Sequence, residues 1–300
     1  MRFGISHCNV GEFAEPDRAH DLARLAEQAG FESLWTVEHV VIPQVYEPRY
    51  PETPDGRFWF PHDLPLADPL IWMAFVAAAT TRLRLGTGIM IVPQRNPLIT
   101  AKEIATLDRL SGGRIEIGVG AGWLREEFEA LGVSFDRRGS AMDEAIAVMR
   151  ELWRPGPRTY RGKVFSFDPV HSEPSPHRAS VPIHIGGAST VAARRAGRTG
   201  DGFFPGGYDR EAVASLVACA RKEFEASGRV GRLEITARWT KDPSQLGDHE
   251  ILRFMQDLGV DRVVLPAQTI AENGLERTIA ELGSNVLPTF ASPSPQERKA

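Results

Sequence analysis

The chain has 300 residues and a formal net charge of −4, from 35 Lys and Arg and 39 Asp and Glu residues. Because acids and bases are interspersed, the sequence gives no sign of a nucleic-acid partner. No apolar run approaches the ~20 residues that a membrane-spanning helix needs. No secretory signal follows Met1, and the two cysteines, Cys8 and Cys219, are far apart. We therefore expect a cytoplasmic protein with reduced thiols and no membrane partner, the alternative for Cys8 being a functional thiol.

Short apolar segments alternate with helical patterns along the chain. The predicted strands are Arg2–Ser6, Ser33–Val37, Leu83–Val92, Arg114–Val119, Val181–Ile185, Asp201–Phe204, Leu233–Arg238 and Arg262–Leu265. The predicted helices are Asp17–Ala29, Pro69–Thr80, Thr100–Leu110, Ala141–Trp153, Thr190–Ala196, Glu211–Ala226, Asp248–Leu258 and Glu272–Leu282. This alternation is typical of α/β proteins and predicts a single (β/α)8 TIM barrel over residues 1–287. We expect residues 288–300, rich in Pro, Ser and charge, to form a flexible tail.

Two insertions interrupt the alternation. Val41–Asp68, after strand two, holds many prolines and several aromatic residues without a period. A long loop at the end of a strand predicts a lid or a substrate wall, the alternative being a packed structural excursion. Arg154–Ser180, after helix four, is rich in prolines and polar residues. We expect both insertions to shape the site for a small-molecule substrate.

Candidate catalytic residues lie where strand two ends. Glu38 and His39 stand side by side there, and strand alternation points one of them into the barrel mouth. A histidine can act as acid or base near neutral pH, so we favour His39 facing the ligand, with Glu38 tuning or positioning the imidazole. The alternative is a histidine hydrogen-bonded for structure.

Glycines mark three further candidate sites. Gly88 lies inside strand three, where a glycine allows close approach of another group or meets a packing need. Two glycine-rich turns each follow a strand and open a helix, a pattern that suits a phosphate. Their candidate residues are Gly120, Ala121, Gly122, Gly186, Gly187, Ser189 and Thr190. Glycines also serve ordinary tight turns, which is the alternative for each.

Several common catalytic signatures are missing. The chain has no His-Glu-x-x-His or Cys-x-x-Cys pattern, so we expect no metal site. The other isolated histidines lack metal-ligand spacing, and we expect most of them in loops or solvent: His62, His171, His177 and His184. There is no Gly-x-Ser-x-Gly motif, and the first glycine turn lacks dinucleotide-binding spacing. No lysine or carboxylate pair suited to an isomerase or aldolase barrel stands at the strand ends.

Taken in order, the motifs resemble the bacterial luciferase-like monooxygenase superfamily over nearly the whole chain. They are Ser33–His39, Leu85–Ile89, Pro93–Pro97 with Lys102, Leu110–Arg114, Gly118–Phe128, Pro182–Gly187 and Gly200–Gly202. The resemblance implies a barrel that binds a flavin or the deazaflavin coenzyme F420 at its C-terminal face. The run Leu110–Phe128 is most like the F420-dependent branch. The resemblance also implies a homodimer.

The same resemblance assigns roles to the candidates. It implies a cis peptide bond between Gly88 and Ile89 against the cofactor ring, and His39 near the reacting face. The two glycine turns, with Ser189 and Thr190, would hold the phosphate. Many F420-dependent members carry Asp-His where this chain has Glu38-His39. The tryptophan that some sugar-phosphate members carry after this histidine is missing, which argues against a sugar phosphate substrate.

Three functions remain open from the sequence. The leading one is an F420-dependent oxidoreductase that transfers hydride to or from a small organic substrate. The others are a monooxygenase that uses reduced FMN and a flavin- or deazaflavin-binding protein without catalysis. F420 carries a longer, more negative tail than FMN. Arg125, Arg194 and Arg195 could meet that tail, or they could be solvated helix charges.

Overall fold

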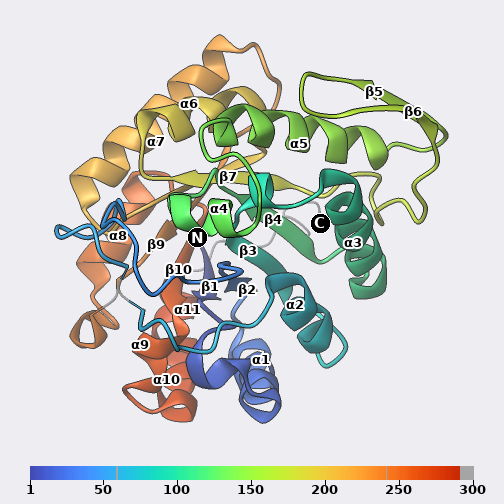
Figure 1. Ribbon diagram of the computed structural model, residues 1–300. Coiled ribbons are helices and arrows are strands. Elements are labelled where there is room, and N and C mark those ends of the chain that lie inside the picture. The colour runs from blue at the N-terminus through green and yellow to red at the C-terminus, as the bar shows by residue number, and fades with distance from the viewer. Residues whose placement is uncertain (59, 241, 291–300) are drawn as a thin grey trace.

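Eight parallel strands close into a barrel in a computed structural model that describes residues 1–58, 60–240 and 242–290. Around the barrel the order is β1, β10, β9, β8, β7, β4, β3, β2 (Figure 1). The bounds are β1 Arg2–Ser6, β2 Ser33–Thr36, β3 Arg84–Met90, β4 Ile115–Val119, β7 Ile183–Gly187, β8 Gly202–Pro205, β9 Glu234–Arg238 and β10 Arg262–Pro266. Helices follow the strands on the outside, which confirms the predicted (β/α)8 barrel.

Each predicted helix is present in the structure, but several of them begin or end at other residues than predicted. They are α1 Pro16–Ala29, α2 Pro69–Ala77, α3 Pro97–Ser111, α4 Arg125–Ala130, α5 Arg138–Leu152, α6 Thr190–Thr199, α7 Arg210–Ala226, α8 His249–Asp257, α9 Ala267–Ala271, α10 Leu275–Glu281 and α11 Leu287–Phe290. The short helices α4, α9 and α11 were not expected. A π-helix, Leu282–Val286, joins α10 to α11. Within the described residues, no helix is both long and apolar enough to cross a membrane.

Side-chain caps determine where two helices start. Asp68 accepts hydrogen bonds from two backbone amides of the first turn of α2, and Asn96 does the same for α3. In both helices a proline follows the capping residue, where its missing N–H costs nothing. The cap at Asn96 therefore begins α3 three residues before the predicted Thr100.

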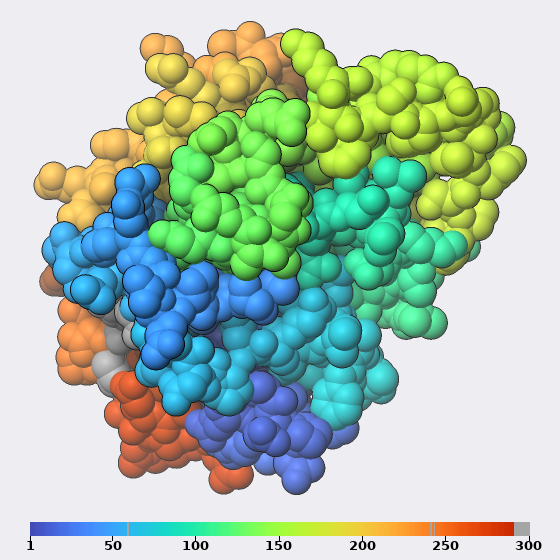
Figure 2. All heavy atoms as spheres, viewed as in Figure 1, coloured from blue at the N-terminus to red at the C-terminus, as the bar shows by residue number. Residues whose placement is uncertain are grey.

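The two insertions differ in structure. The first, residues 41–68, has little regular structure and runs across the barrel mouth. In Figure 2 it lies in blue against the green segment around α4, and the backbone N–H of Glu47 donates to Glu126 Oε1 at 2.8 Å. The second carries an antiparallel hairpin, β5 Arg158–Arg161 and β6 Ser166–Val170, that the sequence pattern did not predict. This hairpin projects beside α5, away from the mouth (Figure 1).

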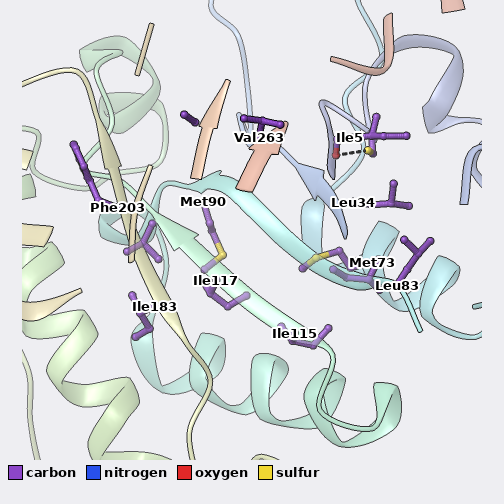
Figure 3. Packing of buried hydrophobic residues seen from close by; sticks show 14 of the residues in the cluster. Ile5, Leu34, Met73, Leu83, Met90, Ile115, Ile117, Ile183, Phe203 and Val263 are labelled. Atoms are coloured by element: carbon purple, nitrogen blue, oxygen red, sulfur yellow. Dashed lines mark hydrogen bonds between the residues drawn. The ribbon is translucent and has the colours of Figure 1, made fainter. Parts of the chain in front are cut away.

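The outer faces of the strands pack against the helices. Figure 3 shows Ile5, Ile117 and Ile183 among the buried side chains of this layer. The last helix joins it, because Phe290 is buried in the same cluster. Of the predicted tail, residues 288–290 therefore lie in α11, and residues 291–300 are outside the described part of the chain.

The inside of the barrel is filled by different residues. Trp35 packs edge-on against Phe204, with ring centroids 5.7 Å apart. A Cβ at Gly86 would lie 2.7 Å from the Trp35 ring, so this strand glycine is explained by packing. Below the tryptophan, Arg262 is fully buried, with its guanidinium 5.0 Å from the ring centroid. These side chains fill the barrel interior beneath its C-terminal mouth.

Candidate cofactor and substrate site

The C-terminal ends of the strands surround one cavity of about 580 Å³. Its walls come from the segments that follow β1 to β4 and β7 to β9, and from the first insertion. Nearly all predicted site residues line it: Glu38, His39, Gly88, Ile89, Gly120, Ala121, Gly122, Gly186, Gly187 and Ser189. Thr190 is not among the lining residues and is exposed as the first residue of α6.

The floor of the cavity is the Gly88–Ile89 peptide, which is cis as the resemblance implied. The Ile89 side chain lies against two glycines of neighbouring strands. A Cβ at Gly120 would lie 2.5 Å from Ile89 Cδ1, and a Cβ at Gly186 would lie 2.3 Å from Ile89 Cγ2. Space for Ile89 thus explains both glycines, which were predicted as phosphate contacts.

One end of the cavity is suited to an anion. The N-terminus of α6 faces it, where Ser189 caps the helix by accepting from the Ala192 N–H at 3.2 Å. Arg138 and Arg195 line the same end, and Arg195 Nε donates to Asp143 at 2.6 Å. Helix N-termini and guanidinium groups together attract phosphate.

Of the three arginines that could meet a cofactor tail or be solvated helix charges, only Arg195 lines the cavity. Arg125 pairs with exposed Asp136 at 2.7 Å, and Arg194 is exposed on α6. Arg138 was missed. Its guanidinium lies 3.8 Å from the Phe135 ring centroid, and Nε donates to the Gly122 carbonyl at 3.2 Å. The helix that carries it begins three residues earlier than predicted, so the sequence pattern placed Arg138 in a loop.

His39 and Glu127 form a hydrogen-bonded pair in the cavity wall. His39 Nδ1 and Glu127 Oε2 are 2.8 Å apart, and the Glu127 side chain is fully buried. Burial alone raises the pKa of Glu127, but hydrogen bonds from His39 and the Val40 N–H bring it below its usual value. An ionised Glu127 can only accept, so Nδ1 of His39 carries a proton and Nε2 is left to exchange one.

Glu38 turns to a different partner. Its carboxylate pairs with Arg95 and accepts a hydrogen bond from the Ile91 N–H, two residues after the cis peptide. Burial raises the pKa of Glu38, and the guanidinium of Arg95 works against that rise. Glu38 therefore fixes the end of β3, which carries the cavity floor, and is not hydrogen-bonded to His39 in the structure. Glu38 was expected to tune or position the ligand-facing histidine; its hydrogen bonds go to the Ile91 N–H and to Arg95 instead.

The first insertion forms the aromatic wall that was predicted as one of two possibilities. Tyr50, Phe58 and Phe60 line the cavity together with Trp123. Ring centroids are 5.2 Å apart for Tyr50 and Phe58, and 4.9 Å apart for Phe58 and His39. The second insertion was wrongly expected to shape the site, because none of the described lining residues comes from it. Its hairpin lies beside α5 on the outside of the barrel.

Two further polar groups were missed at the cavity. His7 follows β1 and is buried, and its position directly after a strand was the signal that could have found it. Burial, with Arg238 nearby, lowers the pKa of His7 to about 3. Arg238, the last residue of β9, pairs with Glu52 of the first insertion. The neighbouring Cys8 lies in the core, where its Sγ donates to the Ile5 carbonyl, so the structure favours the inert thiol.

Deeper in the barrel, three possible metal ligands come together. Atoms of Glu116, His184 and Glu234 lie within 4.8 Å of one another. His184 is thus buried on β7, the exception to the expectation that most isolated histidines lie in loops or solvent; His62, His171 and His177 are exposed. Arg262 already pairs with Glu116 at 3.1 Å and with Glu234 at 2.7 Å. A metal ion would have to displace this guanidinium, so the arrangement is an ion-pair network.

Comparison with known proteins identifies the family of this chain. The model for the luciferase-like monooxygenase family matches residues 1–240. This chain belongs to that family. An uncharacterised protein of Mycobacterium tuberculosis is 33% identical over 214 residues, which cover 71% of this chain and 74% of that protein.

Relatives with named activities use two different cofactors. The F420-dependent glucose-6-phosphate dehydrogenase of Kineococcus radiotolerans is 29% identical over 77% of this chain and 66% of its own length. The FMNH2-dependent dimethylsulfone monooxygenase of Pseudomonas fluorescens is 30% identical over 74% of this chain and 56% of its own length. Family members thus include F420-dependent and FMNH2-dependent enzymes.

A solved structure shares the whole fold. The coenzyme F420-dependent tetrahydromethanopterin reductase of Methanopyrus kandleri superposes with a TM-score of 0.75. The match covers 97% of this chain and 99% of the reductase, at 19% identity. At 19% identity, this similarity establishes the barrel fold. It does not identify the cofactor of this chain, which has to be inferred from the residues that line the cavity.

Proposed function

We propose that this protein is a cytoplasmic oxidoreductase that uses coenzyme F420 to transfer hydride to or from a small organic molecule. The observation that carries the proposal is the placement of His39, held by Glu127, on a cavity whose floor is a bare backbone and whose far end is cationic. A bare backbone floor suits a flat ring, and a cationic end suits a phosphate tail. An F420-dependent dehydrogenase among the relatives supports the choice of F420.

The chain's own residues would then divide the work. The Gly88–Ile89 backbone would support the ring, and Ser189, Arg138 and Arg195, which line the cavity, would hold the phosphate. When bound, F420 supplies the hydride chemistry. His39 takes up or gives the accompanying proton at Nε2, while Glu127 holds the imidazole in place. The aromatic wall excludes water from the reacting groups.

Reduced FMN is the second candidate cofactor, and one observation favours it. Arg195 is paired with Asp143, and Arg138 stacks on Phe135. Because both arginines already have a partner in the protein, they suit the single phosphate of FMN better than the longer anionic tail of F420. A relative that depends on FMNH2 points in the same direction. A protein that binds either cofactor without catalysis is the third possibility, and it would give the His39–Glu127 pair no role.

Fluorescence titration of the purified protein with F420 and, separately, with FMN tests the cofactor. We expect micromolar binding of F420 and at least about 100-fold weaker binding of FMN. Arg195→Gln should weaken F420 binding about ten-fold, because it removes a charge-assisted hydrogen bond. Arg125→Gln is the matched control on an exposed pair. Preference for FMN would move the protein to the oxygen-using enzymes, and binding of neither would contradict the proposed cofactors.

We also propose that the protein works as a homodimer. Helix α2 is apolar on all sides, and its exposed face presents Ile71 and Phe75, which are 74% and 42% exposed. A surface helix without a polar face favours a partner over solvent. A second copy of the chain would cover that face.

A further inference from the structure

The end of the cavity beside Gly206 and the last residue of β9 carries a closed pair of opposite charges. Arg238 reaches into it from the end of β9, and Glu52 reaches in from the first insertion, 186 residues away in sequence. Both side chains are largely buried, with 13% and 16% of their surfaces exposed. Tyr50 Oη also donates to Glu52 Oε2 at 3.2 Å. The insertion therefore brings a counter-ion to the one arginine at this end of the described cavity.

The remaining titratable groups at this end are either uncharged or already paired. His7 is uncharged at neutral pH, since burial lowers its pKa to about 3. Its ring packs edge-on against Phe60, with centroids 5.9 Å apart. Glu38 is paired with Arg95, and His39 with Glu127. Aromatic side chains make up the rest of the wall, as described above.

These charges discriminate between kinds of substrate. An anionic substrate would have to compete with Glu52 for Arg238, and a cationic one would face Arg238 directly. A bound anion would separate Glu52 from Arg238, and a bound cation would compete with Arg238 for Glu52. In both cases one buried charge would lose its partner, which costs free energy of binding. A neutral molecule disturbs neither group and can bury an apolar body against the aromatic wall.

We propose that the substrate is a neutral, largely apolar molecule with a hydroxyl or carbonyl group, and that Glu52 determines this specificity by neutralising Arg238. The inference deepens the proposed function and rests on it for the role of substrate. Its charge rule belongs to the pocket itself and holds for either cofactor. The rule can therefore be tested by ligand binding without turnover.

Three probes of the same shape and different charge test the rule: benzamide, benzoate and benzylammonium. Binding is measured by calorimetry in phosphate buffer, which occupies the anion end. The wild-type protein should bind benzamide at least about ten-fold more tightly than either charged probe. Wild-type preference for benzoate, or no saturable binding of benzamide, would overturn the proposal.

Variants of the pair should reverse the preference in opposite directions. Glu52→Gln should favour benzoate by at least about ten-fold over benzamide, and Arg238→Gln should favour benzylammonium. The double variant should return to benzamide. Glu47→Gln, on an exposed glutamate of the same insertion, should behave as wild type.

Folding and the cofactor proposal are controlled separately. Circular dichroism checks that each variant is folded. If a single variant loosens the insertion because one charge is left unpaired, the double variant, which removes both charges, still tests the preference for benzamide. A folded Glu52→Gln protein that still prefers benzamide would contradict the role of Glu52. Failure of F420 to bind would contradict the proposed function and leave the charge rule standing.

Discussion

His39 and Glu38 are neighbours in sequence, yet their side chains serve different parts of the site. His39 is bonded to Glu127 on α4, and Glu38 to Arg95 and the end of β3. Strand alternation could predict that the two diverge. It could not predict either partner, because Glu127 lies 88 residues away on a helix that the periodicity did not predict. The residue positions were therefore predictable, and their hydrogen bonds were not.

Replacing His39 tests its role in proton transfer. His39→Asn should lower kcat about 100-fold and leave KM and the Kd of the cofactor within about two-fold, since positioned acid–base groups contribute about that much. Glu127→Gln should give a smaller loss, about ten-fold, by releasing the imidazole. Oxidation of reduced F420 with menadione as the acceptor is the assay.

The exposed Glu129 on α4 supplies the control for this pair. Glu129→Gln should leave kcat unchanged. Unaltered kcat in the His39 variant would remove this residue from the mechanism, whereas no turnover in the wild type would favour a binding protein without catalysis.

His7 predicts a measurable pH dependence of stability. Its pKa is about 3 when folded and 6.5 ordinarily, so between these values the unfolded chain binds more protons. Stability is therefore present above pH 6.5 and is lost as the pH falls. From pH 6 to pH 5 the free energy of unfolding should drop by about 1 kcal/mol more in wild type than in His7→Asn.

Asparagine suits this position, because His7 has a φ of 57° and asparagine tolerates the left-handed region. Urea unfolding at the two pH values measures the difference. Equal drops in the two proteins would mean that His7 is not buried in neutral form.

At the scale of elements, the strands were predicted better than the helix ends. Buried β-branched runs with glycine or proline at their ends define a strand locally. The start of α3 instead depends on the Asn96 side chain reaching two backbone amides, which periodicity does not report. The hairpin of β5 and β6 was missed because neither strand has a buried residue or a regular apolar alternation.

The pairing of β3 with β4 makes one glycine indispensable. A Cβ at Gly118 would lie 2.0 Å from the backbone oxygen of Thr87, which cannot move without breaking the ladder. Gly118→Ala should therefore lower the free energy of unfolding by about 3 kcal/mol. Gly139→Ala is the control, since its Cβ would lie 3.4 Å from the flexible end of Arg195. Urea unfolding of both variants compares them, and equal stabilities would show that the strand gap can widen.

For the whole molecule, the apolar face of α2 predicts self-association. Ile71→Asp with Phe75→Asp should convert a dimer to a monomer, because two charges cannot be buried in an apolar interface. Analytical ultracentrifugation measures the mass. Val230→Asp, on a fully exposed loop residue, should leave the dimer intact. A wild-type protein that is monomeric at all concentrations would contradict the proposed homodimer.

The barrel cannot close during synthesis until its last strand, β10, has been made. Strand β1 pairs with β2 on one side and with β10 on the other, and β10 begins only at Arg262. Until that point leaves the ribosome, β1 and β9 each present an unpaired edge. Exposed edges recruit other strands and promote aggregation. A nascent chain arrested before Arg262 should therefore depend on chaperones, whereas release of the last strand removes both edges at once.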